Sequence, residues 1–339
     1  MGVTLRDIAN ELNLSVNTIS RGLRDLPDIA KPTRELIQET AKRMGYQKNM
    51  AASSLRTNKS YILGVIVTDY SNPSNNQIIN GVERVARDMN YTIMVGATNN
   101  NREMEESIVT RMINQGVDGI VLVPTMHSKD VLDIMENNGT PYVLAARKFK
   151  DRETNYVYSD DETGCAMVAD ALYKRGHRDF LYIAATFAES VSNLRYQSFV
   201  NRLVELGLSQ ECVRLVYCDG TQADARLAVD KWFDENASDR LPVTAVFAFS
   251  DYAAIGCYMA CKDRGYRIPD DLSVVGYDNI EFSMLLDPDL STVDNHFYEL
   301  GSACAERILE MINDPENKMA VKKIEFLPEL VSRASVKDI

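Results

Sequence analysis

The segment Val3–Leu23 carries the side chains whose types and spacing best suit binding to another molecule. In a helix that begins at Val16, Ile19 and Leu23 stand four residues apart and can pack against a neighbouring helix. This packing leaves on the outer face the side chains of Val16, Asn17, Ser20 and Arg21. Amide and guanidinium groups on an exposed helix face suit the base edges of the major groove. The segment therefore predicts contact with DNA, and an ordinary helical hairpin is the alternative.

The residues around this face predict two short helices joined by a tight turn. Thr4 can cap the first helix, and Asp7 lies three residues on, where a carboxylate suits a helix N-terminus. Asn13 stands at the break because asparagine tolerates left-handed backbone geometry. Ser15 can cap the second helix, and a third is expected over Pro32–Met44. Such an arrangement is typical of a helix-turn-helix head.

Charge is distributed unevenly along the chain. Residues 1–60 hold ten Lys or Arg and six Asp or Glu, a net charge of +4. The whole chain of 339 residues has a net charge of −12, so the remainder carries −16. A basic head on an acidic body favours DNA contact through the head alone.

Composition excludes several other classes of protein. No apolar run approaches the roughly 20 residues of a membrane span, and the N-terminus lacks the apolar core of a signal peptide. The six cysteines form no CxxC pair, so buried free thiols are expected in place of a metal site, in a cytoplasmic protein. No nucleotide-binding, nucleophile-elbow or zinc-protease motif is present, and neither catalysis nor a cofactor is expected.

From Tyr61 onward, apolar strands alternate with amphipathic helices. The expected strands are 61–68, 91–97, 118–123, 141–145, 156–159, 179–184, 213–217, 245–249 and 273–277. The expected helices are 76–89, 103–114, 129–137, 162–175, 192–206, 223–236 and 251–264. This alternation predicts an α/β body of two doubly wound, parallel-sheet halves, with a ligand cleft at the carboxyl ends of the strands.

Ordered motifs over nearly the whole chain add a family resemblance. They include TLRDIANELNLSVNTISR, LGVIV, GHRDFLYI, IPDDLSVVGYDN, and PDLSTV followed by LPELVSR. In this order and spacing the chain resembles the lactose-repressor/galactose-repressor (LacI/GalR) family of transcriptional regulators. The resemblance implies a homodimer that binds a near-palindromic DNA operator and a small-molecule effector, with a body of periplasmic-binding-protein type.

In the head, the resemblance implies that Val16, Asn17 and Arg21 read base edges, while neighbouring hydroxyl groups hold phosphates. Residues 49–56 resemble a hinge helix that orders on DNA, with Leu55 as a minor-groove wedge. The candidate DNA-contacting residues are Thr4, Ser15, Val16, Asn17, Thr18, Ser20, Arg21, Asn49, Ala52 and Leu55.

For the whole chain, the resemblance implies a head over 1–46, a hinge and linker over 47–60 and an effector-binding and dimerisation body over 61–339. The body would divide into one half of about 61–161 and 292–323 and another of about 162–291 and 324–339. The implied effector-binding residues are Asp69, Tyr70, Asn72, Asp160, Arg195, Asp251, Asn295 and Phe297. Carboxylates, a guanidinium and stacking aromatic rings together suit a sugar-like effector.

Three alternative functions stay open beside the main hypothesis. The main hypothesis is a repressor released from its operator when a sugar-like effector binds. In the first alternative the effector is a corepressor, such as a purine, that strengthens operator binding. The polar Asn75 and Asn76 do not decide between a sugar-like inducer and a corepressor. A solute-binding protein of a transporter and an enzyme acting on a sugar are the alternatives from other classes.

Overall fold

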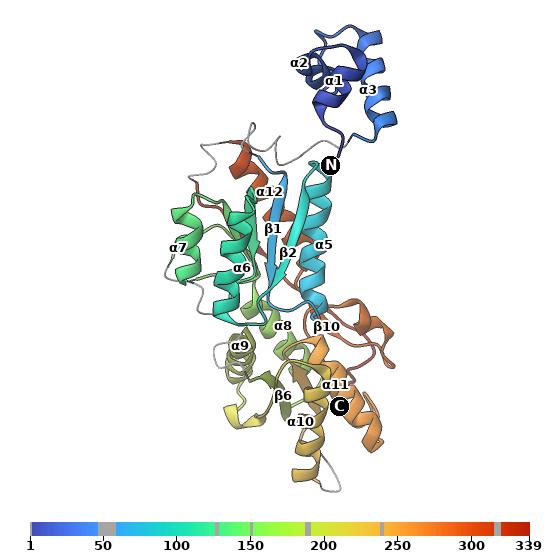
Figure 1. Ribbon diagram of the computed structural model, residues 1–339. Coiled ribbons are helices and arrows are strands. Elements are labelled where there is room, and N and C mark those ends of the chain that lie inside the picture. The colour runs from blue at the N-terminus through green and yellow to red at the C-terminus, as the bar shows by residue number, and fades with distance from the viewer. Residues whose placement is uncertain are drawn as a thin grey trace. The chain divides into compact units, whose positions relative to one another are not determined.

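The computed structural model describes most of the chain in two compact units. The described residues are 2–46, 59–125, 129–149, 152–186, 191–237, 241–314 and 320–339. Contacts divide the chain into a head, Met1–Ser60, and a body, Tyr61–Ile339. Figure 1 shows the helical head and the α/β body.

Over residues 2–46, the head contains three helices, α1 (Leu5–Leu12), α2 (Val16–Gly22) and α3 (Lys31–Met44). Their shared core consists of Ile8, Ala9, Ile19, Ile37 and Ala41. The expected local signals are present, because Thr4 forms a capping box, Asn13 adopts φ 52° and Ser15 caps α2. Short-range polar contacts of this kind stabilise helices that are too short to persist alone.

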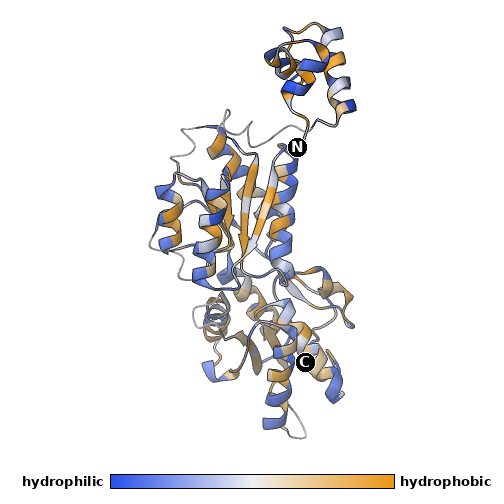
Figure 2. Cartoon of the chain, in the orientation of Figure 1, coloured by the Kyte–Doolittle hydropathy of each residue, from blue (hydrophilic) through white to orange (hydrophobic). Residues whose placement is uncertain are grey.

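The first lobe of the body contains a parallel sheet in the order β11-β5-β4-β3-β1-β2 within the described residues. Its strands are β1 (Ile62–Val67), β2 (Thr92–Ala97), β3 (Gly119–Leu122), β4 (Tyr142–Ala145), β5 (Tyr156–Ser159) and β11 (Lys323–Phe326). Its helices are α5 (Pro73–Asp88), α6 (Arg102–Asn114), α7 (Lys129–Asn137) and α12 (Phe297–Asn313). Apolar strand residues are enclosed while the helices turn polar faces outward (Figure 2).

The second lobe contains a parallel sheet in the order β7-β6-β8-β9. Its strands are β6 (Phe180–Ala185), β7 (Val213–Cys218), β8 (Ala245–Ala248) and β9 (Ser273–Val275). Its helices are α8 (Asp161–Lys174), α9 (Val191–Glu205), α10 (Gln222–Glu235) and α11 (Asp251–Arg264). Two apolar clusters cover the faces of this sheet. The expectation of a helix-turn-helix head with two parallel-sheet α/β halves is confirmed.

The chain passes between the lobes more than once near its C-terminus. Strand β10 (Thr292–Asp294) pairs antiparallel with β12 (Glu329–Val331), whereas β11 pairs in parallel with β5 of the first sheet. Phe326 therefore still belongs to the first sheet, beyond the expected crossover at residue 323. The alternation read from the sequence ended at Tyr277, so it did not include α12 or these last strands. Two short 3-10 helices, Gln210–Cys212 and Glu281–Leu285, complete the second lobe.

Helices α5 and α12 pack with their backbones in unusually close contact. A Cβ atom at Gly81 would lie 2.0 Å from the carbonyl oxygen of Tyr298, and one at Gly301 would lie 2.2 Å from that of Ile78. Glycine is required at both positions because a side chain would collide with backbone atoms. Within the part of the chain that is described, no helix is long and apolar enough to cross a membrane.

Candidate functional site

A cavity of about 650 Å³ lies where the strands of both lobes end. The first lobe contributes to it Thr68, Asp69, Asn72, Ser74, Asn75, Ile78, Asn99, Asn100, Arg102, Val123, Thr125, Ala146, Arg147 and Ser159. The second lobe, the crossover and the first residue of α12 contribute Asp161, Ala185, Ser192, Arg195, Asp219, Gly220, Thr221, Phe249, Ser250, Tyr252, Asp278, Asn295 and Phe297. This volume lies in the range of small-molecule sites, and parallel α/β sheets bind ligands at this edge.

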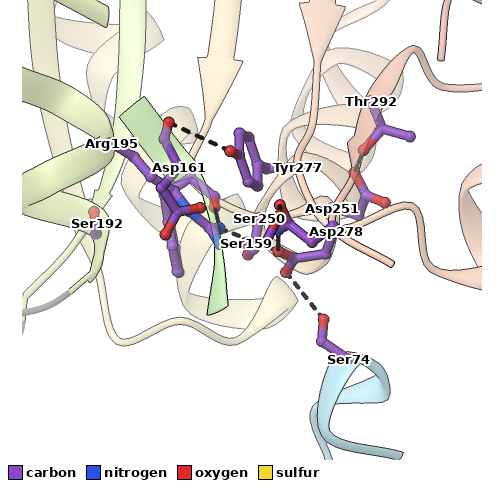
Figure 3. A network of polar contacts seen from close by, with 12 residues as sticks. Ser74, Ser159, Asp161, Ser192, Arg195, Ser250, Asp251, Tyr277, Asp278 and Thr292 are labelled. Carbon is purple, nitrogen blue, oxygen red and sulfur yellow. Dashed lines mark hydrogen bonds and ion pairs between the residues drawn. The ribbon is translucent and has the colours of Figure 1, made fainter. Parts of the chain in front are cut away.

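A buried ionic network forms the second-lobe wall of the cavity (Figure 3). Arg195 on α9 donates from Nε to Oδ1 of Asp161 at 2.9 Å and from Nη1 to Oδ1 of Asp278 at 3.1 Å. Nη1 also donates to the carbonyl oxygen of Phe249 at 2.6 Å, and the guanidinium lies 3.8 Å over the ring of Tyr277. One arginine is thus held by two carboxylates and an aromatic face.

The same network reaches across to the first lobe. Ser74, in the first turn of α5, donates its hydroxyl to Oδ2 of Asp278 at 3.0 Å. Asn295 donates to Oδ1 of Asp278 at 3.3 Å and accepts from the hydroxyl of Ser159 at 3.1 Å. Asp278 therefore contacts groups from both lobes and would respond to any change in the angle between them.

Burial determines the protonation behaviour of this network. Burial raises the pKa of Asp278 to about 6, although Arg195 and Ser74 lower it in part. Burial also raises the pKa of Asp161. For Arg195, burial disfavours the charged form, but the two carboxylates outweigh it and hold its pKa well above the ordinary value. The guanidinium stays charged, while the pKa of Asp278 lies at about 6.

Amide side chains dominate the first-lobe wall. Asn72 caps α5 by accepting from the backbone nitrogen of Ser74 at 3.0 Å. Asn75 donates to the hydroxyl of Thr68 at 3.1 Å. Asn99 and Asn100 both adopt left-handed backbone conformations, with φ 51° and 54°, in the loop between β2 and α6. Backbone strain of this kind is common at ligand sites, and the amides supply both donors and acceptors.

The second candidate surface is the outer face of α2 in the head. Val16 and Asn17 are exposed. Arg21 is 39% exposed and forms an ion pair with Asp28. The hydroxyl groups of Ser15 and Thr18 form a hydrogen bond of 2.8 Å, in which either oxygen can be the donor. The amide of Asn17 in the first turn of this capped helix and the guanidinium of Arg21 in its last turn could enter a major groove.

Within the described ranges, no group of three or more His, Cys, Asp or Glu side chains is placed to hold a metal ion. The six cysteines are free thiols.

Comparison with known proteins identifies relatives along the full chain. Residues 169–336 match the periplasmic binding protein-like domain family. The chain is 28% identical over 314 residues to catabolite control protein A of Priestia megaterium, covering 92% of this chain and 93% of that protein. It is 29% identical over 335 residues to the HTH-type transcriptional repressor PurR of Pasteurella multocida (strain Pm70), covering 98% of each.

A solved structure of the lac repressor dimer bound to operator and the anti-inducer ONPF has the same fold. It superposes with a TM-score of 0.88 at 21% identity and covers 99% of this chain and 100% of that one. Over nearly its full length the chain is thus similar to transcriptional regulators of the LacI/GalR type. For a LacI/GalR regulator, the cavity between the lobes is the candidate effector site, and the outer face of α2 is the candidate operator-reading surface.

Five of the eight expected effector-binding residues line the cavity. They are Asp69, Asn72, Arg195, Asn295 and Phe297. Arg195 was expected to donate directly to the effector, but Asp161 and Asp278 already occupy much of its guanidinium. Its contact with an effector stays a prediction.

The other three expected residues lie outside the cavity lining, each for a local reason. Tyr70 is 52% exposed and donates its hydroxyl to the carbonyl oxygen of Val95 at 3.0 Å. Asp160 caps α8 and accepts from the hydroxyl of Thr163 at 2.6 Å. The structure thus gives Tyr70 and Asp160 roles in the fold, and direct contact of either with an effector stays a prediction.

Asp251 is also occupied by the fold. It is fully buried, and its two carboxyl oxygens accept from the hydroxyl of Thr292 at 2.5 Å and the backbone nitrogen of Ile280 at 2.9 Å. The residue that caps α11 and lines the cavity is its neighbour Ser250. The expectation that Asp251 accepts from an effector is therefore replaced by a role in joining α11 to the crossover strand.

In the head of the regulator, Thr4 and Ser15 act as helix caps, and Val16, Asn17, Thr18, Ser20 and Arg21 lie on α2. Their contacts with DNA stay predictions. The hinge candidates Asn49, Ala52 and Leu55 lie outside the described residues.

Sequence reasoning missed several cavity residues, chiefly Asp161, Asp278, Asn99, Asn100 and Arg147. Each directly follows, or lies within a few residues of, the carboxyl end of a parallel strand. That position is a usable signal, because the carboxyl ends of parallel strands meet at the ligand edge.

Proposed function

We propose that this chain is a sequence-specific DNA-binding repressor whose operator affinity is set by a small molecule in the cavity between its lobes. The observation that carries the proposal is the presence, on one LacI/GalR chain, of a helix-turn-helix head with an exposed reading face and a two-lobed body with a cavity of about 650 Å³. Since operator DNA lies in the cytoplasm, the protein is proposed to act there.

The head is proposed to read bases through Val16, Asn17 and Arg21. Asn17 can pair with adenine and Arg21 with guanine, while Val16 offers an apolar contact to a thymine methyl group. The hydroxyl groups of Ser15, Thr18 and Ser20, with Thr4, are proposed to hold phosphates and set the register. Asn49, Ala52 and Leu55 are proposed to contact the minor groove as a hinge helix.

The effector is proposed to be a polyhydroxylated, sugar-like molecule. Asparagine side chains on the first-lobe wall can donate to and accept from hydroxyl groups. Phe249 and Phe297 line the same cavity and can pack on the apolar face of a sugar ring. Arg195 and Asp278 supply charge on the opposite wall.

Coupling is proposed to run along β1, α5 and α12. The first strand begins beside Tyr61, where the linker enters the body, and ends beside the cavity residues Thr68 and Asp69. Helix α5 also starts at the cavity and extends away from it over 16 residues, or about 24 Å. Because α5 and α12 touch backbone to backbone at Gly81, they would move together when the lobes change their angle.

The proposed sign is release, in which the effector lowers operator affinity by disfavouring the hinge conformation. A difference in effector affinity between the two states is required, and about 1–3 kcal/mol is the usual scale of such coupling. A corepressor would instead raise operator affinity. A titration of operator binding with and without effector therefore gives the sign of the effect directly.

A homodimer is proposed because two heads are needed to read two half-sites. Three apolar side chains of the segment Glu281–Leu285 are exposed, namely Phe282 at 52%, Met284 at 57% and Leu285 at 71%. Exposed apolar side chains concentrated in this way favour protein contact. Light scattering should give the dimer mass for the native chain and a lower mass for Leu285→Asp, whereas a native monomer would contradict the assignment.

Selection from a random duplex library tests the proposed function. The full-length chain should enrich a near-palindromic sequence, and Arg21→Ala should fail to enrich the same base at its half-site position. Arg43→Ala is a matched control, because Arg43 is an exposed arginine on α3 of the head and forms an ion pair with Glu11 on α1. Enrichment of no sequence by the native chain would overturn the proposal.

A further inference from the structure

Three arginines among the described residues line the cavity, and Arg147 differs from the other two in its partners. Arg195 is held by the two carboxylates described above, and Arg102 forms an ion pair with Asp130. Arg147 instead donates from Nη1 to the carbonyl oxygen of Pro124 at 2.6 Å. No ion pair joins Arg147 to another described residue. Most of its N–H groups therefore remain available to a molecule in the cavity.

The environment of Arg147 favours a negatively charged partner. The residue is half-buried, and burial lowers its pKa to about 10, with Glu105 opposing this shift and the nearby Arg195 adding to it. It is still charged at neutral pH, so a guanidinium lies partly desolvated and close to another guanidinium. A partly buried charge without an ion-pair partner is costly, and an anion placed against it would offset that cost.

The carboxylates of the cavity already have other partners. Asp161 and Asp278 bind Arg195. Asp69 accepts from the backbone nitrogen and hydroxyl of Ser71 at 2.8 and 2.7 Å. Asp219 accepts in the same way from Thr221. Glu105 and Asp161 favour the charged form of Arg147, but Glu105 does not line the cavity and Asp161 binds Arg195. A negative charge that binds the guanidinium from inside the cavity would therefore come from the bound molecule.

We infer that Arg147 is an anion-binding residue of the cavity and that the effector is a sugar derivative bearing a phosphate or carboxylate group. The inference rests on the proposed effector function of the cavity. Arg147 follows β4 and Pro124 follows β3, which are neighbouring strands, so the guanidinium is braced at the sheet edge. The fork of N–H groups suits a phosphate or carboxylate, and nearby amides suit the hydroxyl groups of a sugar.

Thermal unfolding of the full-length chain with inorganic phosphate, and separately with acetate, tests this assignment. Sodium chloride at matched ionic strength is the reference for screening. Phosphate or acetate should raise the midpoint beyond the chloride reference in the native chain. In Arg147→Gln the apparent anion affinity should fall about tenfold or more, as expected for a lost charge-assisted bidentate contact. Arg147→Lys should be intermediate because it keeps the charge but not the fork.

Arg152→Gln is the matched control, because Arg152 lies in the same lobe, pairs with Asp133 and Glu136, and does not line the cavity. Comparing glucose 6-phosphate, glucuronate and glucose then distinguishes a phosphate from a carboxylate source. An anion effect equal to that of chloride, or one unchanged in Arg147→Gln, would overturn the inference. Operator binding is measured separately, so loss of the anion site and loss of the proposed function are distinguishable.

Discussion

The head and the cavity use polar side chains in opposite ways. In the head, the capping contacts are exposed and local, such as the 3.4 Å bond from the nitrogen of Asp7 to Thr4 three residues earlier. In the cavity, the contacts are buried and distant, such as Ser74 with Asp278, which are 204 positions apart. Substitutions on the α2 face should therefore change binding alone, whereas those around the cavity should change folding and binding together.

Substitution of glycine should give the largest difference between the body and the head, measured as the loss of unfolding free energy. Gly81→Ala places a methyl group against the backbone oxygen of Tyr298, so the body should lose about 3 kcal/mol or more of unfolding free energy. In the head, a Cβ at Gly22 would lie 2.5 Å from Cδ1 of Ile37, the movable end of a side chain. Gly22→Ala should cost less, about 1 kcal/mol. Denaturant unfolding measures both, and equal losses would break the contrast.

Arg21→Ala should produce the largest change in DNA binding. Loss of a bidentate base contact should weaken binding to the selected operator by about 10- to 100-fold. Because Arg21 is 39% exposed, the unfolding midpoint should stay within about a degree of the native value. Fluorescence anisotropy and a thermal melt check the two parts, and an unchanged operator affinity would remove Arg21 from the reading face.

Asp278→Asn should alter stability with a defined pH dependence. The folded-state pKa of about 6 lies above the ordinary 3.8. The native state therefore binds a proton that the unfolded chain releases, and this stabilisation is present below about pH 4 and lost as pH rises through 6. Asparagine stays neutral, so the variant should be more stable than the native chain at pH 7.5 by about 1–3 kcal/mol, with the gain vanishing near pH 4.

Asp271→Asn provides a control of opposite sign. A side-chain bond from Arg267 lowers the pKa of Asp271, so its charged form stabilises the fold above the ordinary pKa. The variant should be slightly less stable than the native chain at neutral pH. Denaturant unfolding between pH 4 and 7.5 measures both variants, and a pH-independent difference for Asp278→Asn would contradict the account.

Asp28→Asn should give the smallest effect and the sharpest test of how the head reads bases. Asp28 pairs with Arg21 on the exposed face. Removing its negative charge should strengthen binding to random duplex. Because Arg21 would no longer be held by Asp28, the ratio of operator to random affinity should also fall, by about threefold to tenfold. Anisotropy with both duplexes checks this. A uniform rise for every sequence would mean that Asp28 acts only through its charge.

The head could be predicted from sequence because its determinants are local. Thr4, Asn13 and Ser15 each act within a few residues, so their types and spacing are sufficient. The alternation of strands and helices in the body was equally clear up to Tyr277, because burial of parallel strands leaves continuous apolar runs.

The cavity could be predicted only in part because its residues meet through the topology of the sheets. Asp278 is brought to Arg195 and Ser74 only after the chain has folded, and no spacing in the sequence encodes that meeting. The same limit explains Asp251. A carboxylate at the start of a helix suits either a ligand or a structural bond, and the partner Thr292 lies 41 positions away.

The central claim is that binding of a small molecule in the cavity and binding of operator DNA by the head are coupled. The decisive measurement is an operator titration of the full-length chain, followed by anisotropy, with and without the sugar or sugar derivative that most stabilises it in a thermal-shift panel. The account predicts a shift in half-saturation of about 5- to 150-fold, with an equal reciprocal change in the affinity for that compound when operator is present. Superimposable operator curves at saturating compound would contradict it.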